Sequence, residues 1–137
     1  LENYTDLLNS LIKFNSLMIC SNPDKTVIRG KNFMICAGLL AEYYEKIGGK
    51  VIYYGKPHSN IYEFCYKFIE GENKILVIGD SLENDIMGAN SQNLDSLLIT
   101  NGIHRDVNNN NDIDKQKLDD LIKKKNIKPK FVMRKLN

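Results

Sequence analysis

The hydrophobic pattern of this chain predicts helices that alternate with short strands. Apolar residues recur at helical spacing in four segments, residues 2–14, 32–48, 58–70 and 115–126, and a shorter helix is expected within 81–93. Short apolar runs typical of buried strands lie at residues 16–20, 51–54, 74–80, 96–100 and 130–133. The remaining polar segments, 21–31 and 105–114, are predicted to be loops. Alternation of this kind favours right-handed βαβ units and a mostly parallel sheet, in an α/β fold.

Composition and charge are ordinary for a globular protein. The chain has 137 residues, of which 42% are hydrophobic and 26% charged, with a net charge of +2. This charge is too small to argue for nucleic acid as a partner. No apolar stretch approaches the length of a membrane span, and the first residues lack the features of a signal peptide. We therefore expect a cytoplasmic protein without membrane contact, and the missing initiator Met suggests a part of something longer.

Three cysteines, Cys20, Cys36 and Cys65, lie far apart and have apolar neighbours. None of them forms a Cys-x-x-Cys pair. The sequence therefore predicts reduced, buried thiols rather than disulfides, metal ligands or a catalytic thiol.

The most informative stretch is "ILVIGDSLENDIMGAN", at residues 75–90. Its apolar run delivers Asp80 to the end of a predicted strand, the edge at which parallel α/β sheets bind ligands. Asp85 follows near the start of a helix, so the turn between them can bring both carboxylates toward one point. Two converging carboxylates suit Mg²⁺. The alternative is that Asp85 only caps its helix and Asp80 only ends its strand.

A second candidate is Lys56, in the stretch "VIYYGKPHSN" just past another predicted strand. A lysine at this edge can pair with a phosphate or hold an anionic nucleophile, and Gly55 and Pro57 fix the turn that carries it. Taken alone, Lys56 is better interpreted as an exposed loop lysine.

Together these motifs resemble the class IIA hydrolases of the haloacid dehalogenase (HAD) superfamily, the group that includes nitrophenyl-phosphate and sugar-phosphate phosphatases. The matching residues are "NPD" at 22–24, "GKP" at 55–57, "IGDSLENDIMGAN" at 78–90 and "LLITNG" at 97–102. The resemblance implies that residues 1–50 are the C-terminal part of a C2-type α/β cap. It also implies that residues 51–137 are the second half of a Rossmann-like HAD core.

The resemblance also implies roles for individual residues. Asp80 corresponds to the Mg²⁺ ligand, Asp85 supports the metal shell, and Lys56 neutralises charge between the nucleophile and the phosphoryl group. Asn22 and Asp24 lie where the cap helps to close the pocket around a small phosphorylated substrate. The implied activity is Mg²⁺-dependent hydrolysis of that substrate.

One motif of the family is absent from its expected place. HAD enzymes begin with an apolar strand and Asp-x-Asp, whose first Asp is the nucleophile and whose second is the general acid–base. Asp24-Lys25-Thr26 resembles the phosphorylated triplet of P-type ion pumps, but the match stops at Val27. Asp112 and Asp114 have the spacing of the motif, but they lie downstream in a polar loop.

The sequence therefore predicts a chain that is inactive alone. It would need a partner half that supplies the nucleophile, or it would associate with itself. Two alternatives stay open, a non-catalytic remnant or binding module and a phosphoacceptor domain that uses Asp24.

Overall fold

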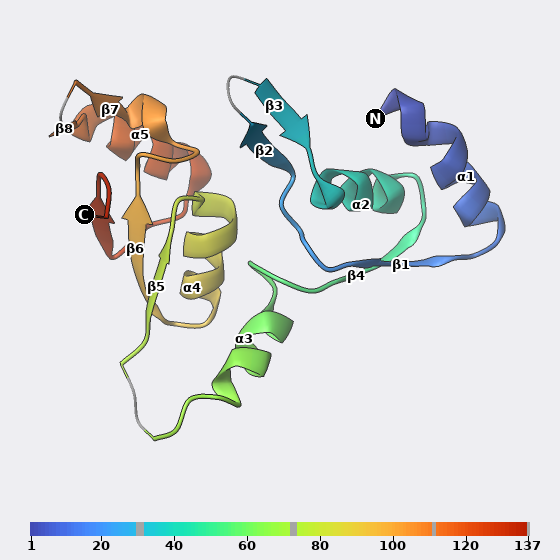
Figure 1. The fold of residues 1–137 in the computed structure, drawn as a ribbon, viewed down its shortest axis with the longest axis horizontal. Coiled ribbons are helices and arrows are strands. Elements are labelled where there is room, and N and C mark those ends of the chain that lie inside the picture. Colours follow the sequence, from blue (N-terminus) through green and yellow to red (C-terminus); the bar gives the residue numbers. More distant parts are fainter. Residues whose placement is uncertain (30–31, 72–73, 111, 137) are drawn as a thin grey trace. The chain divides into compact units, whose positions relative to one another are not determined.

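The computed structural model describes residues 1–29, 32–71, 74–110 and 112–136 (Figure 1). Contacts between Cα atoms divide the chain into two compact units, Leu1–Ile61 and Tyr62–Asn137. Each unit has its own helices and its own parallel strand pairing. The predicted α/β class with mostly parallel sheets is therefore confirmed.

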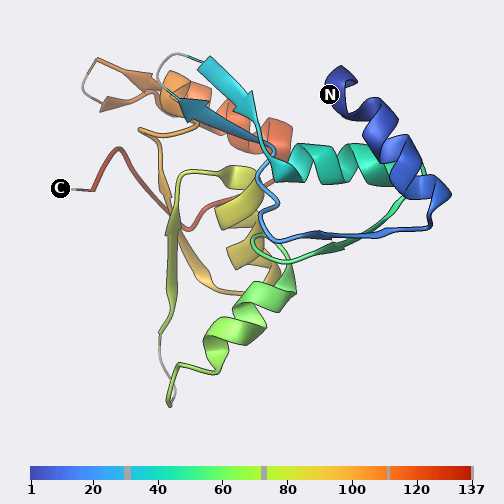
Figure 2. The same ribbon diagram turned by 45° about the vertical axis from the view of Figure 1, so that its right-hand side comes forward.

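The first unit combines helices with two separate strand pairs. Its elements are η1 (Glu2–Tyr4), α1 (Thr5–Lys13), β1 (Leu17–Cys20), β2 (Thr26–Arg29), β3 (Asn32–Ile35), α2 (Ala37–Lys46), β4 (Lys50–Tyr53) and the start of α3 (Ser59–Tyr66). Strands β1 and β4 pair in parallel, and β2 and β3 form an antiparallel pair. Both views show α1 and α2 on the same side of the β1–β4 pair (Figures 1 and 2).

The β2–β3 pair corrects the sequence prediction. Residues 21–31 were expected to be a loop, and 32–48 a single helix, but Thr26 pairs with Ile35 and α2 begins only at Ala37. The β-branched residues of "TVIR" favour a strand, and cross-strand pairing outweighs the helical spacing downstream.

Tyr44 anchors the helix α2 to the strands. Its side chain is fully buried, and its hydroxyl donates a hydrogen bond of 2.8 Å to the backbone oxygen of Ser16, just before β1. The ring packs on Gly49, where a Cβ would overlap it. Ala41, one turn before Tyr44, is also fully buried, so the face that carries both residues turns inward.

The second unit is built on a three-stranded parallel sheet. Its elements are β5 (Leu76–Gly79), η2 (Leu82–Ile86, a π-helical turn), α4 (Met87–Ser91), β6 (Asp95–Ile99), η3 (Arg105–Val107), β7 (Asn108–Asn109), β8 (Asp112–Ile113), α5 (Lys115–Lys125) and β9 (Phe131–Met133). The strand order is β5-β6-β9. The predicted polar loop 105–114 is wrong in part, because η3 and the short β7–β8 antiparallel pair lie within it.

Among the described residues of the second unit, the helices and the core cluster lie on one face of this sheet. Both crossovers, β5 to β6 and β6 to β9, step in the same direction, and right-handed crossovers then place their helices on the same face. The core cluster lies there and consists of Leu82, Ile86, Leu98, Val107, Leu118 and Ile127.

The opposite face carries Ile78 and Phe131, which flank Leu97 in register. Ile78 is 48% exposed and Phe131 49%, so this face is apolar and open.

Among the described residues, no helix combines the length and the apolar character that crossing a membrane requires.

Candidate active site

Asp80 directly follows β5, at the carboxyl end of the parallel sheet. Its Oδ2 accepts a hydrogen bond of 3.1 Å from the backbone N–H of Ile103, in the loop after β6. The carboxylate packs so closely on Gly102 that a Cβ there would overlap it. The structure therefore holds Asp80 at the sheet edge where α/β proteins bind ligands.

Asp85 lies within η2 and is only 3% exposed. Its Oδ2 accepts a hydrogen bond of 3.0 Å from the backbone N–H of Ser81, and its carboxylate packs on Gly79, where a Cβ would overlap it. Gly79 and Ser81 flank Asp80, so the Asp85 carboxylate lies against the backbone on both sides of Asp80, at the end of β5. The same hydrogen bond would serve a purely structural cap, and the metal role of Asp85 therefore stays a prediction.

Several hydrogen bonds join residues within the turn from Asp80 to Asp85. The Ser81 hydroxyl accepts a hydrogen bond of 3.2 Å from the backbone N–H of Asn84. The Ser81 carbonyl oxygen accepts from the N–H groups of Asp85 and Ile86, at 3.0 and 3.1 Å. Because the first N–H groups of a helix lack partners within the helix, these bonds fix the backbone that carries both carboxylates.

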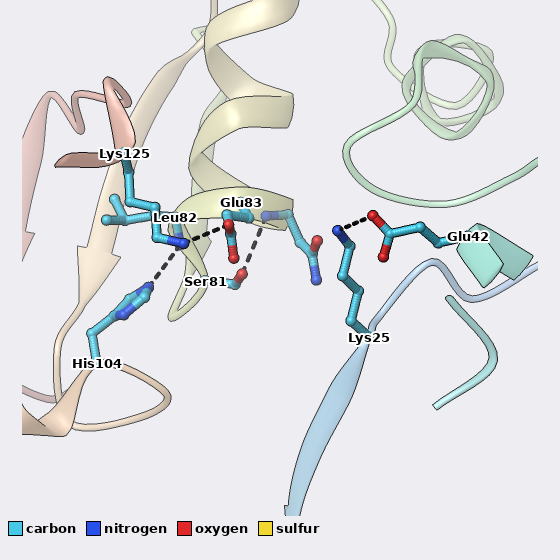
Figure 3. Close-up of polar contacts among 8 residues, drawn as sticks. Lys25, Glu42, Ser81, Leu82, Glu83, His104 and Lys125 are labelled. Carbon is cyan, nitrogen blue, oxygen red and sulfur yellow. Dashed lines mark hydrogen bonds and ion pairs between the residues drawn. The ribbon is translucent and has the colours of Figure 1, made fainter. Parts of the chain in front are cut away.

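Two side chains from elsewhere in the second unit also hold this turn, and the sequence analysis missed both (Figure 3). His104 Nε2 accepts a hydrogen bond of 3.1 Å from the Leu82 N–H, and Lys125 Nζ lies 2.7 Å from Glu83 Oε1. A signal for His104 existed, since "NGIH" follows a predicted strand and must lie at the same sheet edge as Asp80.

The pKa of His104 is lowered, chiefly because burial disfavours the charged imidazole. The negative charges of Glu83 and Asp80 oppose this shift, and the positive charge of Lys125 adds to it. The neutral form is the one that can accept the Leu82 hydrogen bond on Nε2.

The carboxylates fit a magnesium ion that is held largely by water and substrate. In the part of the chain that the structure describes, no three His, Cys, Asp or Glu side chains gather into a metal-binding group. Mg²⁺ commonly takes one or two carboxylates and completes its octahedron with water and phosphate oxygens. Asp80 and Asp85 supply that number, and Gly79 and Gly102 leave the space that their carboxylates occupy.

Asn22, Asp24 and Lys56 belong to the first unit, where pairing of β1 with β4 brings their loops together. The Tyr54 N–H donates to the Cys20 oxygen at 2.8 Å, which extends the pairing beyond the strands. Further on, Gly55 has φ +96°, and a Cβ there would meet Pro23 Cδ at 2.8 Å and the Ser21 oxygen at 3.0 Å. The "NPD" and "GKP" motifs therefore touch, although thirty residues separate them.

Lys56 is exposed within this turn, and its peptide bond to Pro57 is cis. Asp24 is half-buried. Its N–H donates a 3.4 Å hydrogen bond to Asn22 Oδ1, and its backbone oxygen accepts a 3.0 Å bond from the Gly38 N–H. The substrate roles predicted for Asn22, Asp24 and Lys56 stay predictions.

The downstream Asp-x-Asp spacing has a structural explanation. Asp114 is the N-cap of α5, and its side chain accepts a hydrogen bond of 3.2 Å from the Lys117 N–H. Asp112 Oδ1 accepts from the neighbouring Ile113 N–H at 2.8 Å. Both carboxylates therefore stabilise the local backbone.

The three cysteines are free, but they are not equally buried. Cys20 is buried, and burial raises the pKa of its thiol, an effect that a hydrogen bond with the Asn22 backbone partly offsets. A raised pKa disfavours the reactive thiolate. Cys36 is half-buried and Cys65 is exposed, so the prediction of three buried thiols is wrong for Cys65.

Comparisons with known proteins place these motifs in a family. The family model described as HAD-hydrolase-like matches residues 53–137. The matched region contains Lys56, Asp80 and Asp85, whereas Asn22 and Asp24 lie outside it. None of the curated proteins matches the chain.

Solved structures match nearly the whole chain. A hydrolase of the haloacid dehalogenase-like family from Brucella suis is 35% identical, with a TM-score of 0.77, and the match covers 99% of this chain and 50% of that one. A possible sugar phosphatase of the HAD superfamily from Cytophaga hutchinsonii is 28% identical, with a TM-score of 0.73, over 96% and 45% of the two chains.

A third structure is a glycerol phosphate phosphatase from Mycobacterium tuberculosis in complex with calcium. It is 26% identical, with a TM-score of 0.56, over 69% of this chain and 28% of that one. The present chain thus spans half or less of the length of each of these three proteins.

Proposed function

The chain belongs to the HAD-hydrolase-like family, and from this premise we propose that it is the metal-binding part of a phosphohydrolase. The reaction is Mg²⁺-dependent hydrolysis of a phosphate ester on a small metabolite. The phosphatases among its structural relatives support the reaction class. The relative that was solved with calcium supports a divalent cation.

The observation that carries this proposal is the pair of carboxylates at the end of β5. Asp80 and Asp85 are each packed on a glycine and each bonded to a backbone N–H, so their positions are set before any ligand binds. Asp80 and Asp85 would hold a Mg²⁺ ion there, which would supply positive charge to the phosphoryl oxygens. Positioned charges of this kind provide much of the catalysis in phosphoryl transfer.

Lys56 supplies the second positive charge in this proposal. Its ammonium group pairs with the phosphoryl oxygens or with the anionic nucleophile, and Gly55 and Pro57 define the turn that presents it. Asn22 and Asp24 contact the non-reacting part of the substrate, which suits their place beside the "GKP" turn.

The nucleophile comes from a companion polypeptide in this proposal. A doubly wound sheet continues from its switch point in the opposite direction and places the helices of its other half on the other face. In the second unit, β5 is an edge strand, and the face that carries Ile78 and Phe131 is open and apolar. A companion that adds a strand beside β5 would cover this face and bring a carboxylate next to Asp80.

The domain assignment is part of the same proposal. Residues 1–50 are the end of a cap, and residues 51–137 are half of the core. The length of the Brucella suis relative leaves room for a companion about as long as this chain, since the match covers 50% of that protein.

The test is hydrolysis of p-nitrophenyl phosphate with Mg²⁺. The chain alone should show no turnover above background, because loss of a nucleophile removes most of the rate enhancement of a catalytic unit. Adding the part of the Brucella suis protein that lies outside the match should restore turnover.

Two variants make the test specific. Lys56→Ala should lower the restored rate by about a hundredfold or more, whereas Lys50→Ala, on the exposed edge of β4, should leave it unchanged. If the chain alone is active and Asp24→Asn abolishes the activity, Asp24 is a phosphoacceptor and the proposal is wrong. If light scattering shows that the chain pairs with itself and not with the companion, the proposal that a companion polypeptide supplies the nucleophile is wrong.

A further inference from the structure

The loop after β6 holds the Asp80 turn through two hydrogen bonds that run in opposite directions. In one, the Ile103 N–H donates to Asp80 Oδ2 at 3.1 Å. In the other, the Leu82 N–H donates to His104 Nε2 at 3.1 Å. Neighbouring residues of one loop thus bind residues on both sides of Ser81. Ile103 contributes its backbone N–H to this exchange, and His104 contributes its imidazole side chain.

We infer that His104 is a positioning residue, which fixes the orientation of the Asp80 carboxylate by holding the Leu82 amide. This inference rests on the proposed metal role of Asp80. It adds a residue that does not itself touch metal or substrate.

The backbone amides of the turn show why a side-chain acceptor is needed at this place. The Ser81 N–H is bound by Asp85 Oδ2, and the Asn84 N–H is bound by Ser81 Oγ. The Leu82 N–H has His104 as its acceptor, and the Leu82 side chain is fully buried. Without His104, this amide would lose its partner in a partly buried place, and the turn would rearrange to find another.

A rearrangement of this loop would reach Asp80 directly. Gly102 lies against the Asp80 carboxylate, and Ile103 donates to it, so both residues that precede His104 contact that side chain. The space is tight, since even a Cβ at residue 102 would overlap the carboxylate. Any movement that follows loss of the His104 bond is therefore transmitted to the metal residue.

The surrounding charges are compatible with a neutral imidazole as acceptor. Burial lowers the pKa of His104, and Lys125 adds to this effect, against the opposing charges of Glu83 and Asp80. The neutral ring then carries its proton on Nδ1 and accepts on Nε2. This tautomer can be observed without any metal.

The first measurement uses the wild-type chain labelled with ¹⁵N and free of metal. A scalar coupling across the hydrogen bond should join the Leu82 amide nitrogen to His104 Nε2, and the imidazole shifts should show the Nδ1–H tautomer. If His104 is instead protonated on Nε2 near neutral pH, it cannot accept this bond and the inference is overturned.

The second measurement compares magnesium titrations of three variants, followed through the amide shifts of residues 79–85. His104→Leu removes the acceptor and should weaken Mg²⁺ binding about five- to tenfold. His104→Gln places an amide oxygen where Nε2 was and should stay within about twofold of the wild type. His58→Leu removes the other histidine, in the first unit, and should change nothing.

The outcomes separate this inference from the proposed function. If the wild type shows the Leu82 coupling but no magnesium shifts at residues 79–85, the metal proposal fails, and the positioning role for a metal falls with it. If Mg²⁺ binds there and His104→Leu binds it as tightly as the wild type, the metal proposal stands and the positioning role alone is wrong. Should His104→Leu fail to fold, the comparison of His104→Gln with wild type decides, and a tenfold loss in that variant contradicts an acceptor role.

Discussion

The two units bury their apolar side chains in different ways. The second unit has a contiguous core to which η2, β6 and α5 all contribute, with Leu82, Ile86 and Leu98 fully buried. Among the residues whose burial is described, the first unit has fewer buried apolar side chains. An apolar groove of about 250 Å³ lies among η1, α1, β1 and α2. Leu8 is buried at the edge of this groove.

This difference matches the demands that the proposed function makes on each unit. Asp80 and Asp85 must be held within a fraction of an ångström to bind a metal, and they lie on the densely packed unit. The first unit presents its candidate residues from exposed loops between short strands, where more variation is tolerated. Three predictions test whether the packing difference is real, in order of decreasing effect.

The largest effect is expected from leucine truncation. Leu98→Ala should lower the free energy of unfolding of the second unit by about 3–4 kcal/mol, because it opens a cavity in the middle of the core. Leu8→Ala should cost the first unit only about 2 kcal/mol, since this side chain already borders an open groove. Amide hydrogen exchange of β6 and of β1 in urea measures each unit separately. Equal losses would show that the two units are packed alike.

The second prediction compares one buried tyrosine from each unit. The Tyr44 hydroxyl donates to Ser16, whereas the buried Tyr62 hydroxyl has no hydrogen-bond partner among the described residues. Tyr44→Phe should therefore lower stability by about 1 kcal/mol, and Tyr62→Phe should raise it by a similar amount, since it removes an unsatisfied polar group. Urea unfolding of the two matched variants measures the change in the free energy of unfolding, and its sign, for each variant. A loss of stability in Tyr62→Phe would mean that this hydroxyl has a partner.

Local sequence patterns predicted the helices and strands well where a single hydrophobic pattern dominates the segment. The strand before Asp80 and the amphipathic helix at α5 were both expected from spacing alone, and the family resemblance was confirmed. The β2–β3 pair was missed because its stability comes from pairing between strands, which helical spacing in residues 32–35 concealed.

The candidate site shows the same limit. That Asp80 would lie at a sheet edge followed from one strand and its end. The bonds that fix it could not be predicted, because Ile103 is 23 residues away from Asp80 and donates through its backbone, which carries no sequence signal. His104 is separated from Leu82 by the rest of η2, by α4 and by the strand β6.

The smallest effect is expected from the pH dependence of the second unit. The folded pKa of His104 is lowered by burial from its ordinary value of about 6.5. Between the folded and unfolded pKa values, the unfolded chain binds more protons than the folded one, so unfolding takes up a proton and stability rises with pH. The stability that the neutral His104 contributes is therefore complete above the unfolded pKa and is lost as the pH falls through the folded pKa.

Urea midpoints measured from about pH 7.5 to about 5.5 should fall further in the wild type than in His104→Gln, which has no titrating ring at this position. His58→Gln, in the first unit, controls for removal of a histidine elsewhere. If the wild type and His104→Gln show the same pH dependence, His104 does not titrate differently in the folded second unit, and the contrast between the units does not extend to this loop.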